Sequence, residues 1–162
     1  MNACHGLATQ CRNTAMTLAT MDIGHQVAAL PWRREPDGSV LVLLVTTLQT
    51  HRWIIPKGWP VPGHRDFASA ALEAREEAGV LGDTVSTSIG TFMYEKRRAS
   101  GAVLVEVTVF PLEVREELEQ WPEGKRRQRA WFTLSDAAAL VQEPGLQELL
   151  LRLDTSSELR AQ

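Results

Sequence analysis

Residues 53–80 read WIIPKGWPVPGHRDFASAALEAREEAGV, and this stretch decides the fold. It begins with a short apolar run suited to a buried strand and continues through a loop that prolines stiffen. Asp66 then predicts the N-cap of a helix, which the alanines favour and which Gly79 ends. The stretch therefore predicts a strand, a loop and a helix in direct succession.

The predicted helix carries a group of carboxylates on one face. Glu73, Glu76 and Glu77 are spaced i, i+3 and i+4, which brings their side chains together. Anions this close repel one another unless a cation lies among them, and hard divalent ions prefer oxygen ligands. Such a cluster suits metal-assisted attack on a phosphate chain. A solvated helix face is the alternative interpretation of the same triplet.

The whole stretch resembles the Nudix box, the signature of hydrolases that cleave a nucleoside diphosphate linked to another moiety. Gly58 matches its opening glycine. The closing run is matched at the correct spacing by Glu73, Ala74, Glu76, Glu77, Gly79 and Val80.

Two positions depart from that signature. His64 stands where the family has its first glutamate, and Leu72 stands where it has its arginine. In the family these two residues chiefly form a supporting ion pair, and losing both leaves no buried charge unpaired. We expect Leu72 to pack under the helix and His64 to be an exposed loop residue. A substitute hydrogen-bonding role for His64, titrating near neutrality, is the alternative.

The resemblance implies an α/β fold, a Nudix-type α/β/α sandwich around a mixed β-sheet. It also implies Mg²⁺, with Mn²⁺ as a second choice, held by Glu73, Glu76, Glu77 and the Gly58 carbonyl. Glu76 and Glu77 would be the catalytic residues, and a water made more acidic by the metal would attack phosphorus. In relatives the general base is a box glutamate or an acid from a later loop. The loop candidates here are Glu116, Glu117 and Glu119.

Basic residues gather in two clusters outside the box, residues 96–98 and 125–129. Together with residues 51–60 and 130–132, they resemble the diphosphoinositol polyphosphate phosphohydrolase branch of the family and its bacterial relatives, over roughly residues 25–153. That branch cleaves diphosphoinositol polyphosphates and, in several members, diadenosine polyphosphates. Solvated loop charge is the alternative. The cations expected to bind substrate phosphates are Arg52, Lys57, Lys96, Arg97, Arg98, Arg127 and Arg129.

Composition narrows the class of protein. The chain of 162 residues is long enough for one domain, which we place at residues 23–153 between a flexible segment 1–22 and a polar tail 154–162. Its net charge of −3 argues against a nucleic-acid binder. Both cysteines, Cys4 and Cys11, lie outside the domain, and no apolar run is long enough to cross a membrane. We expect a soluble cytoplasmic protein.

The remaining elements follow from periodicity and turn residues. Strands are expected at 25–32, 40–45, 84–94, 103–112 and 130–132, with a hairpin turn at 35–38 and a basic turn at 96–101. The strand at 103–112 should have two faces, one with the valines at 103, 105, 107 and 109 and the other with residues 104, 106, 108 and 110. Residues 113–124 are expected to be turn-rich. Ser135 predicts the N-cap of a helix through Val141, and a last helix spans 146–153. Trp53 and Trp131 are expected in the core, and Trp59 either there or as a stacking platform.

The sequence therefore predicts a Mg²⁺-dependent hydrolase. Its substrate would be a highly phosphorylated small molecule, such as a diphosphoinositol polyphosphate or a diadenosine polyphosphate, cleaved at a phosphoanhydride bond. Because of the changes at His64 and Leu72, the alternative is a weakened Nudix-like module that binds a phosphorylated ligand without turnover. No sequence feature indicates an oligomeric state.

Overall fold

The computed structural model describes residues 22–156, 158 and 159 of the chain. Apart from Asp22, the predicted flexible segment and its cysteines lie outside the described residues. Within them, no helix is long and apolar enough to cross a membrane. The cytoplasmic location stays a prediction.

A mixed sheet of eight strands forms the centre of the domain. The path through it runs β3-β2-β1-β7-β5, with β4 and β6 beside β1 and β7 and with β8 beside β2. β1 and β7 run parallel over nine residue pairs, whereas all other pairs are antiparallel. The strands are β1 (Gly24–Arg34), β2 (Val40–Thr46), β3 (Trp53–Ile54), β4 (Lys57–Gly58), β5 (Val80–Thr84), β6 (Gly90–Arg98), β7 (Gly101–Glu117) and β8 (Arg129–Thr133).

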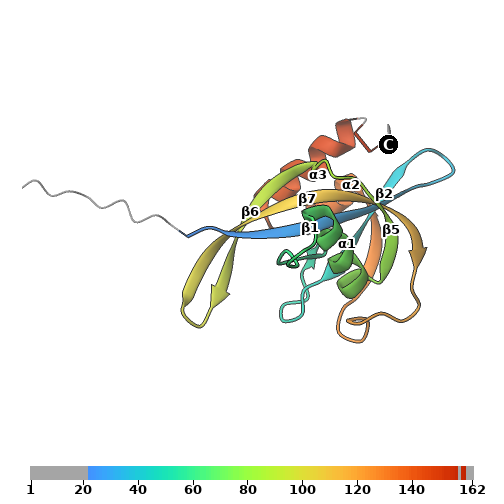
Figure 1. The fold of residues 1–162 in the computed structure, drawn as a ribbon. Helices are drawn as coiled ribbons and strands as arrows, with labels where there is room; N and C mark the ends of the chain where they lie inside the picture. Colours follow the sequence, from blue (N-terminus) through green and yellow to red (C-terminus); the bar gives the residue numbers. More distant parts are fainter. Residues whose placement is uncertain (1–21, 157, 160–162) are drawn as a thin grey trace, which may run out of the picture.

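Helices cover both faces of this sheet (Figure 1). The helix α1 (Asp66–Glu73) and the π-helical turn η1 (Ala74–Ala78) lie on one face, where Ala70, Ala74 and Ala78 pack against strand residues. The helices α2 (Leu134–Leu140) and α3 (Pro144–Thr155) lie on the other, with Leu146 and Leu149 among the core residues. The predicted α/β/α sandwich around a mixed sheet is confirmed.

Alternation along β7 explains how one strand serves both cores. Val105, Val107 and Val109 belong to the core under α2 and α3. Phe110 and Leu112 belong to the core under α1. This is the two-face pattern predicted for residues 103–112, because successive side chains of a strand point to opposite faces.

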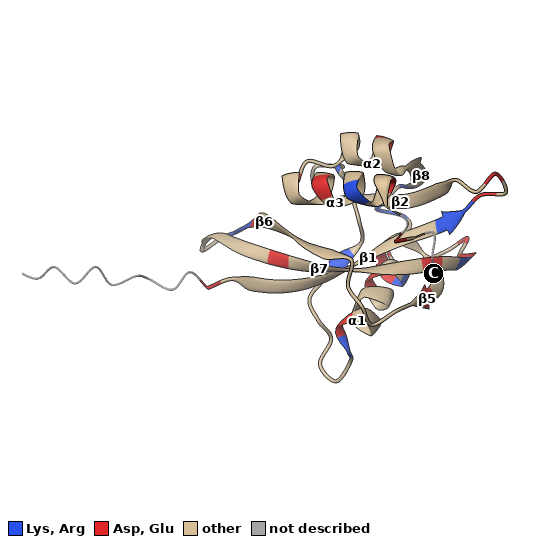
Figure 2. Ribbon diagram, turned by 90° about the horizontal axis from the view of Figure 1, so that it is seen from above, with Lys and Arg blue, Asp and Glu red and all other residues tan. Residues whose placement is uncertain are grey.

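Three predictions about strands and turns are wrong. Residues 84–94 belong to two separate strands, since β5 ends at Thr84 and β6 begins at Gly90. The predicted basic turn is mostly strand, because β6 runs to Arg98 and pairs it with Gly101. Residues 113–117, expected in a turn-rich segment, continue β7 to its pairing with β5. Charged residues suit these strand ends because residues 97–98 and 115–117 are exposed. Figure 2 shows the basic residues of the ribbon in blue and the acidic residues in red.

Both predicted N-caps are displaced by one or two residues. Arg65 is the N-cap of α1 and makes no side-chain cap bond, so Asp66 is the first helical residue. There its negative charge favours the positive end of the helix dipole. Thr133 rather than Ser135 caps α2, because its hydroxyl accepts a hydrogen bond of 3.1 Å from the Asp136 amide.

The C-terminal residues are more structured than a polar tail. Helix α3 begins at Pro144 and continues to Thr155, past the predicted boundary at residue 153. Leu159 is only 1% exposed and belongs to the core under α2 and α3. Its carbonyl accepts a hydrogen bond of 3.0 Å from Arg34 Nη2. The sequence missed this contact because a single leucine in a polar segment shows no periodicity.

Substituting Leu159 tests this packing. We expect Leu159→Ala to lower the free energy of unfolding by about 2–4 kcal/mol, because it removes buried apolar volume. Leu151, which is 50% exposed on α3, is the matched control, and Leu151→Ala should change the stability by less than about 0.5 kcal/mol. Urea unfolding followed by circular dichroism measures both. Equal effects of the two substitutions would contradict the packing of Leu159.

Candidate functional site

Gly58 and Glu73 meet at the start of the site. β4 places Gly58 opposite Val27 of β1, and the Glu73 side chain at the end of α1 lies directly against it. A Cβ atom added to Gly58 would overlap the Glu73 carboxylate. The glycine is therefore required by a close approach, and the approach holds the carboxylate beside the β4 backbone.

The other box glutamates lie on a wider helical turn. The α-helical pattern ends at Glu73 and continues as the π turn η1, which carries Glu76 and Glu77. π turns inside helices are frequent at functional sites. Because this turn changes the angular spacing, the predicted i, i+3, i+4 face is altered. Glu76 is exposed, whereas the Glu77 side chain is only 13% exposed.

Glu77 is held by two elements that are distant in sequence. Its Oε2 accepts a hydrogen bond of 3.2 Å from the Lys57 amide of β4. Its Oε1 accepts one of 2.9 Å from Arg127 Nη2. Arg127 also donates through Nε to Glu123 Oε2 at 2.5 Å and through Nη1 to the Thr46 carbonyl at 2.9 Å. Arg127 thus joins two carboxylates to the end of β2.

Burial makes these carboxylates costly to ionise. Burial raises the pKa of Glu77 to about 7, although the charges of Arg127 and Lys57 and the Lys57 amide bond act in the opposite direction. Burial also raises the pKa of Glu73, and the like charges of Glu76 and Glu123 raise it further. The site therefore favours an added cation or a bound proton.

Glu123 is an acid of the site that sequence reasoning missed. It follows β7 in the segment of residues 118–128, here called the docking loop, and its charge acts on Glu73. The expected loop acids lie elsewhere: Glu116 and Glu119 are exposed, and Glu117 contacts Trp131 and Arg33. In the sequence Glu123 follows several other glutamates, and its neighbouring residues do not distinguish it from them.

The docking loop binds the carbonyl groups at the end of η1. The Glu123 amide donates to the Glu76 carbonyl at 3.1 Å, and Trp121 Nε1 donates to the Glu77 carbonyl at 3.0 Å. Arg129 Nη1 donates to the Ala78 carbonyl at 2.8 Å and to the Gly79 carbonyl at 3.0 Å. These carbonyls have no partners within the helix, so the loop completes their hydrogen bonding.

These contacts give Arg129 a structural role. Besides its bonds to η1, its Nη2 donates to the Leu118 carbonyl at 2.8 Å, and its guanidinium stacks on Trp121 at 4.1 Å. They give no support to its predicted role in substrate binding. Gly79 has a left-handed φ of 63°, and a Cβ there would overlap the Trp121 ring. Tryptophan, arginine and glycine together fix the helix end.

The predicted cations of β4 and β6 surround two aromatic rings. Lys57 is half-buried, with Nζ 4.5 Å from the Tyr94 ring centroid and 3.4 Å from its hydroxyl. Lys96 and Arg98 lie 5.3 and 5.4 Å from the Trp59 ring. Trp59 is 40% exposed and is therefore not a core residue. Arg97 is exposed.

Charged residues of both basic clusters act on the Lys57 ammonium group. Burial lowers its pKa, Glu77 raises it, and both Lys96 and Arg127 lower it. Because these charges act on one ammonium group, both clusters lie near Lys57. The sequence could not place them relative to each other.

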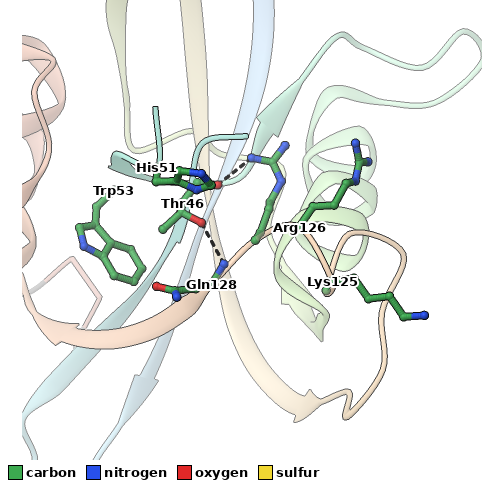
Figure 3. A pocket seen from close by; sticks show the side chains of 8 residues that line it. Thr46, His51, Trp53, Lys125, Arg126 and Gln128 are labelled. Carbon is green, nitrogen blue, oxygen red and sulfur yellow. Dashed lines mark hydrogen bonds between the residues drawn. The ribbon is translucent and has the colours of Figure 1, made fainter. Parts of the chain in front are cut away.

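Arg127 also lines a cavity of about 410 Å³, here called the basic cavity. Figure 3 shows His51, Thr46 and Trp53 across from the residues of the docking loop. His51 has a positive φ of 51°, an unusual conformation for a non-glycine residue. The charged and aromatic residues that line the cavity are His51, Trp53, Lys125, Arg126 and Arg127. Its cationic lining suits phosphate groups. Trp53 also packs against the core, as predicted.

The donor set of the box fits a hard divalent ion. Carboxylate oxygens and a backbone carbonyl are the ligands such ions prefer, and the mutual repulsion at Glu73 is relieved by positive charge. Among residues 22–156, 158 and 159, however, no three Asp, Glu, His or Cys side chains are close enough to hold one ion. Glu77 is turned toward Arg127, so binding of metal requires a side-chain rearrangement. The metal and catalytic roles of the box residues stay predictions.

The two substituted box positions leave no buried charge behind. His64 is exposed, as predicted, with Nδ1 3.5 Å from the Pro62 carbonyl. Leu72 is half-buried and belongs to neither core cluster of the described residues, so the expectation that it packs under the helix is wrong.

Removing the Arg129 guanidinium should destabilise the protein. We expect Arg129→Met to lower the free energy of unfolding by about 3 kcal/mol, because buried carbonyls lose charged donors. Arg126→Met is the control, since that side chain is 61% exposed and its loss should change stability by about 0.5 kcal/mol or less. Urea unfolding of both variants measures the difference. A stable Arg129→Met variant with impaired substrate binding would restore the original interpretation.

The raised pKa of Glu77 predicts how metal-free stability depends on pH. Between its ordinary pKa of 4.5 and about 7, the folded state retains a proton that the unfolded chain releases. Stability should therefore fall as pH rises through this window, by up to about 3 kcal/mol, and level off above it.

In Glu77→Gln this fall should be smaller, with a remainder from Glu73, whose pKa is also raised. Thermal unfolding with a chelator, from pH 4 to 8, measures both curves. Identical slopes would show that Glu77 titrates normally.

Comparison with known proteins identifies the family. The NUDIX domain model matches residues 24–153. "Nudix hydrolase 21, chloroplastic" of Arabidopsis thaliana is 34% identical over 129 residues, covering 76% of this chain and 63% of that protein. "Diphosphoinositol polyphosphate phosphohydrolase 3-alpha" of Mus musculus is 33% identical over 119 residues, covering 72% of this chain and 68% of that protein. The match thus spans somewhat less than two thirds of the plant relative.

A solved structure shows the same fold. The "C. elegans Ap4A Hydrolase Binary Complex" has a TM-score of 0.62 at 19% identity, covering 86% of this chain and 98% of that one. At this identity the likeness concerns the fold alone. The family match, the relatives and the box geometry agree, and the chain belongs to the Nudix family.

Proposed function

We propose that this protein is a Mg²⁺-dependent hydrolase that cleaves a phosphoanhydride bond in a highly phosphorylated small molecule. A diphosphoinositol polyphosphate or a diadenosine polyphosphate is the proposed substrate. The main support is that Arg127 donates a hydrogen bond to the box residue Glu77 and also lines the basic cavity. The name of the mouse relative supports the choice of a diphosphoinositol polyphosphate.

Cations near Lys57 support a substrate with many phosphates. Arg127 lines the basic cavity, and Lys96 and Arg98 flank Trp59. A phosphate chain between them would be neutralised by charge-assisted hydrogen bonds. Lys57 itself is half-buried and its pKa is lowered, so an incoming phosphate would favour its charged form.

Arg52 has a weaker claim to a phosphate. Its Nη1 donates to Glu143 Oε1 and to Gln142 Oε1, each at 3.2 Å. These bonds occupy the guanidinium and turn it toward the α2–α3 connection.

The box residues would hold the metal and manage the proton. Glu73, Glu76, Glu77 and the Gly58 carbonyl are the proposed ligands, and a bound divalent ion would withdraw charge from the phosphoryl oxygens. Glu77, with a pKa raised to about 7, can accept a proton at its carboxylate near neutral pH. Glu123, in the same hydrogen-bonded network, is the loop acid best placed to share this task.

Binding without turnover remains the second candidate function. One observation favours it: Glu77 is engaged by Arg127 and by the Lys57 amide, and the box acids of the described residues are not gathered around one point. If substrate cannot draw Arg127 away from Glu77, the ligand would bind and stay intact. Hydrolysis assays separate the two functions.

The decisive assay measures product release with Mg²⁺ from diphosphoinositol polyphosphate, diadenosine polyphosphates, ADP-ribose and nucleoside triphosphates. We expect cleavage of one of the first two compounds, with Glu77→Gln slower by at least about a hundredfold. Chelation of Mg²⁺ should abolish the reaction, because the carboxylates then repel the phosphates.

Glu148→Gln is the matched control, because Glu148 is an exposed acid on α3. It should retain the wild-type rate. Tight binding of these compounds without any product would instead establish the binding function. Equal rates in wild type and Glu77→Gln would contradict the proposed role of the box.

A further inference from the structure

Glu143 is a buried acid that the proposed mechanism does not use. It immediately precedes α3 and is only 7% exposed. Its Oε1 accepts the hydrogen bond from Arg52, whereas its Oε2 is buried and has no hydrogen-bond partner among the residues that the structure describes. Buried polar atoms are nearly always paired, so an unpaired carboxylate oxygen requires an explanation.

Glu143 lines a second cavity, of about 390 Å³, here called the Glu143 cavity. Met93, Leu104 and Pro144 supply apolar wall, and Tyr94 supplies an aromatic ring. The charged groups are the carboxylates of Glu143 and Glu95 and the guanidinium of Arg52, which is already paired. The lining is therefore acidic and apolar, in contrast to the basic cavity.

The Glu143 cavity borders the box. Tyr94 belongs to its wall, and its hydroxyl lies 3.4 Å from Lys57 Nζ. Because the Lys57 amide also donates to Glu77 Oε2 at 3.2 Å, this lysine contacts both the box and the wall of the cavity. A substrate whose phosphates contact Lys57 and Arg127 can extend its other end past Tyr94.

We propose that the Glu143 cavity binds the end of the substrate remote from the cleaved bond, and that this end is an amino-substituted purine. The inference rests on the proposed function and selects the diadenosine polyphosphate as substrate. The purine faces would contact the apolar walls, and the amino group would donate to the Glu143 carboxylate. The amino group would take the place of the half-exposed Arg52, whose guanidinium donates to Glu143 Oε1.

Electrostatics disfavour the other substrate class in this cavity. A fully phosphorylated inositol ring presents anions in every direction, and two carboxylates in the wall would repel them. A purine carries no negative charge and offers N–H donors. A site built to accept a hydrogen bond also rejects an analogue that lacks the donor, because its own polar atom is then left unpaired.

Nucleoside binding tests the proposal without catalysis. Adenosine and purine riboside, which lacks the amino group, are titrated into ¹⁵N-labelled protein. Adenosine should shift the amide signals of Met93, Glu95 and Leu104 and bind about tenfold more tightly than purine riboside. In Glu143→Met this preference should disappear. Glu148→Met, an equal change at an exposed acid of α3, should retain it.

Glu143→Met alone leaves Arg52 without its partner and could fail to fold. The double variant Arg52→Met/Glu143→Met removes both partners, so no buried charge is left unpaired. It too should lose the preference. Equal binding of the two nucleosides to the wild type, or shifts confined to the basic cavity, would overturn the proposal.

Hydrolysis rates separate this proposal from the proposed function. The ratio of kcat/KM for diadenosine polyphosphate over diphosphoinositol polyphosphate should fall at least about tenfold in Glu143→Met. An unchanged ratio overturns the role of Glu143 while leaving the hydrolase intact. If wild type cleaves neither compound, the proposed function fails, and nucleoside binding still decides what the Glu143 cavity holds.

Discussion

The site depends on the hydrogen bonds that hold the backbone carbonyl groups at the end of η1. Helices end with carbonyl groups that lack partners, and water or side chains usually supply them. Here the docking loop and Arg129 bind the carbonyls of residues 76–79. The same loop carries Glu123 and Arg127, which contact the box through their side chains. Carboxylates and cations are thereby fixed relative to one another, although about fifty residues separate them in sequence.

Burial then sets the electrostatic state of the site. It is the largest influence on Lys57, Glu77 and Tyr94, lowering the pKa of the first and raising the others, that of Tyr94 to about 12. Without ligand, Lys57 therefore loses its proton more readily, and Glu77 retains its proton more readily, than is usual for these residue types. A bound phosphate would favour the charged form of Lys57, and a bound divalent ion would favour the charged form of Glu77. Ligand binding and protonation are in this way linked.

The altered box positions show that a supporting ion pair is not the only means of holding the loop. The hydroxyl of the buried Ser69 accepts a hydrogen bond of 3.0 Å from the Val61 amide, and the His64 amide bonds the Val61 carbonyl at 3.0 Å. The approach of Glu73 to Gly58 adds a steric contact. Because these interactions involve backbone and small groups, they do not require charge at positions 64 and 72.

The sequence alone determined the features that depend on neighbours along the chain. The resemblance of residues 53–80 to the Nudix box implied the family and the sandwich. The hairpin turn at residues 35–38 and the two-faced pattern of β7 were predicted from the residues themselves, because periodicity and turn chemistry are local. Only the tertiary structure decided which charged residues share a site. It brought Glu123 and Arg127 to Glu77, turned Arg129 to the backbone, and paired Arg52 with Glu143 across 91 residues. The sequence cannot tell one glutamate or arginine from another, because burial and long-range packing decide which of them belongs to the site.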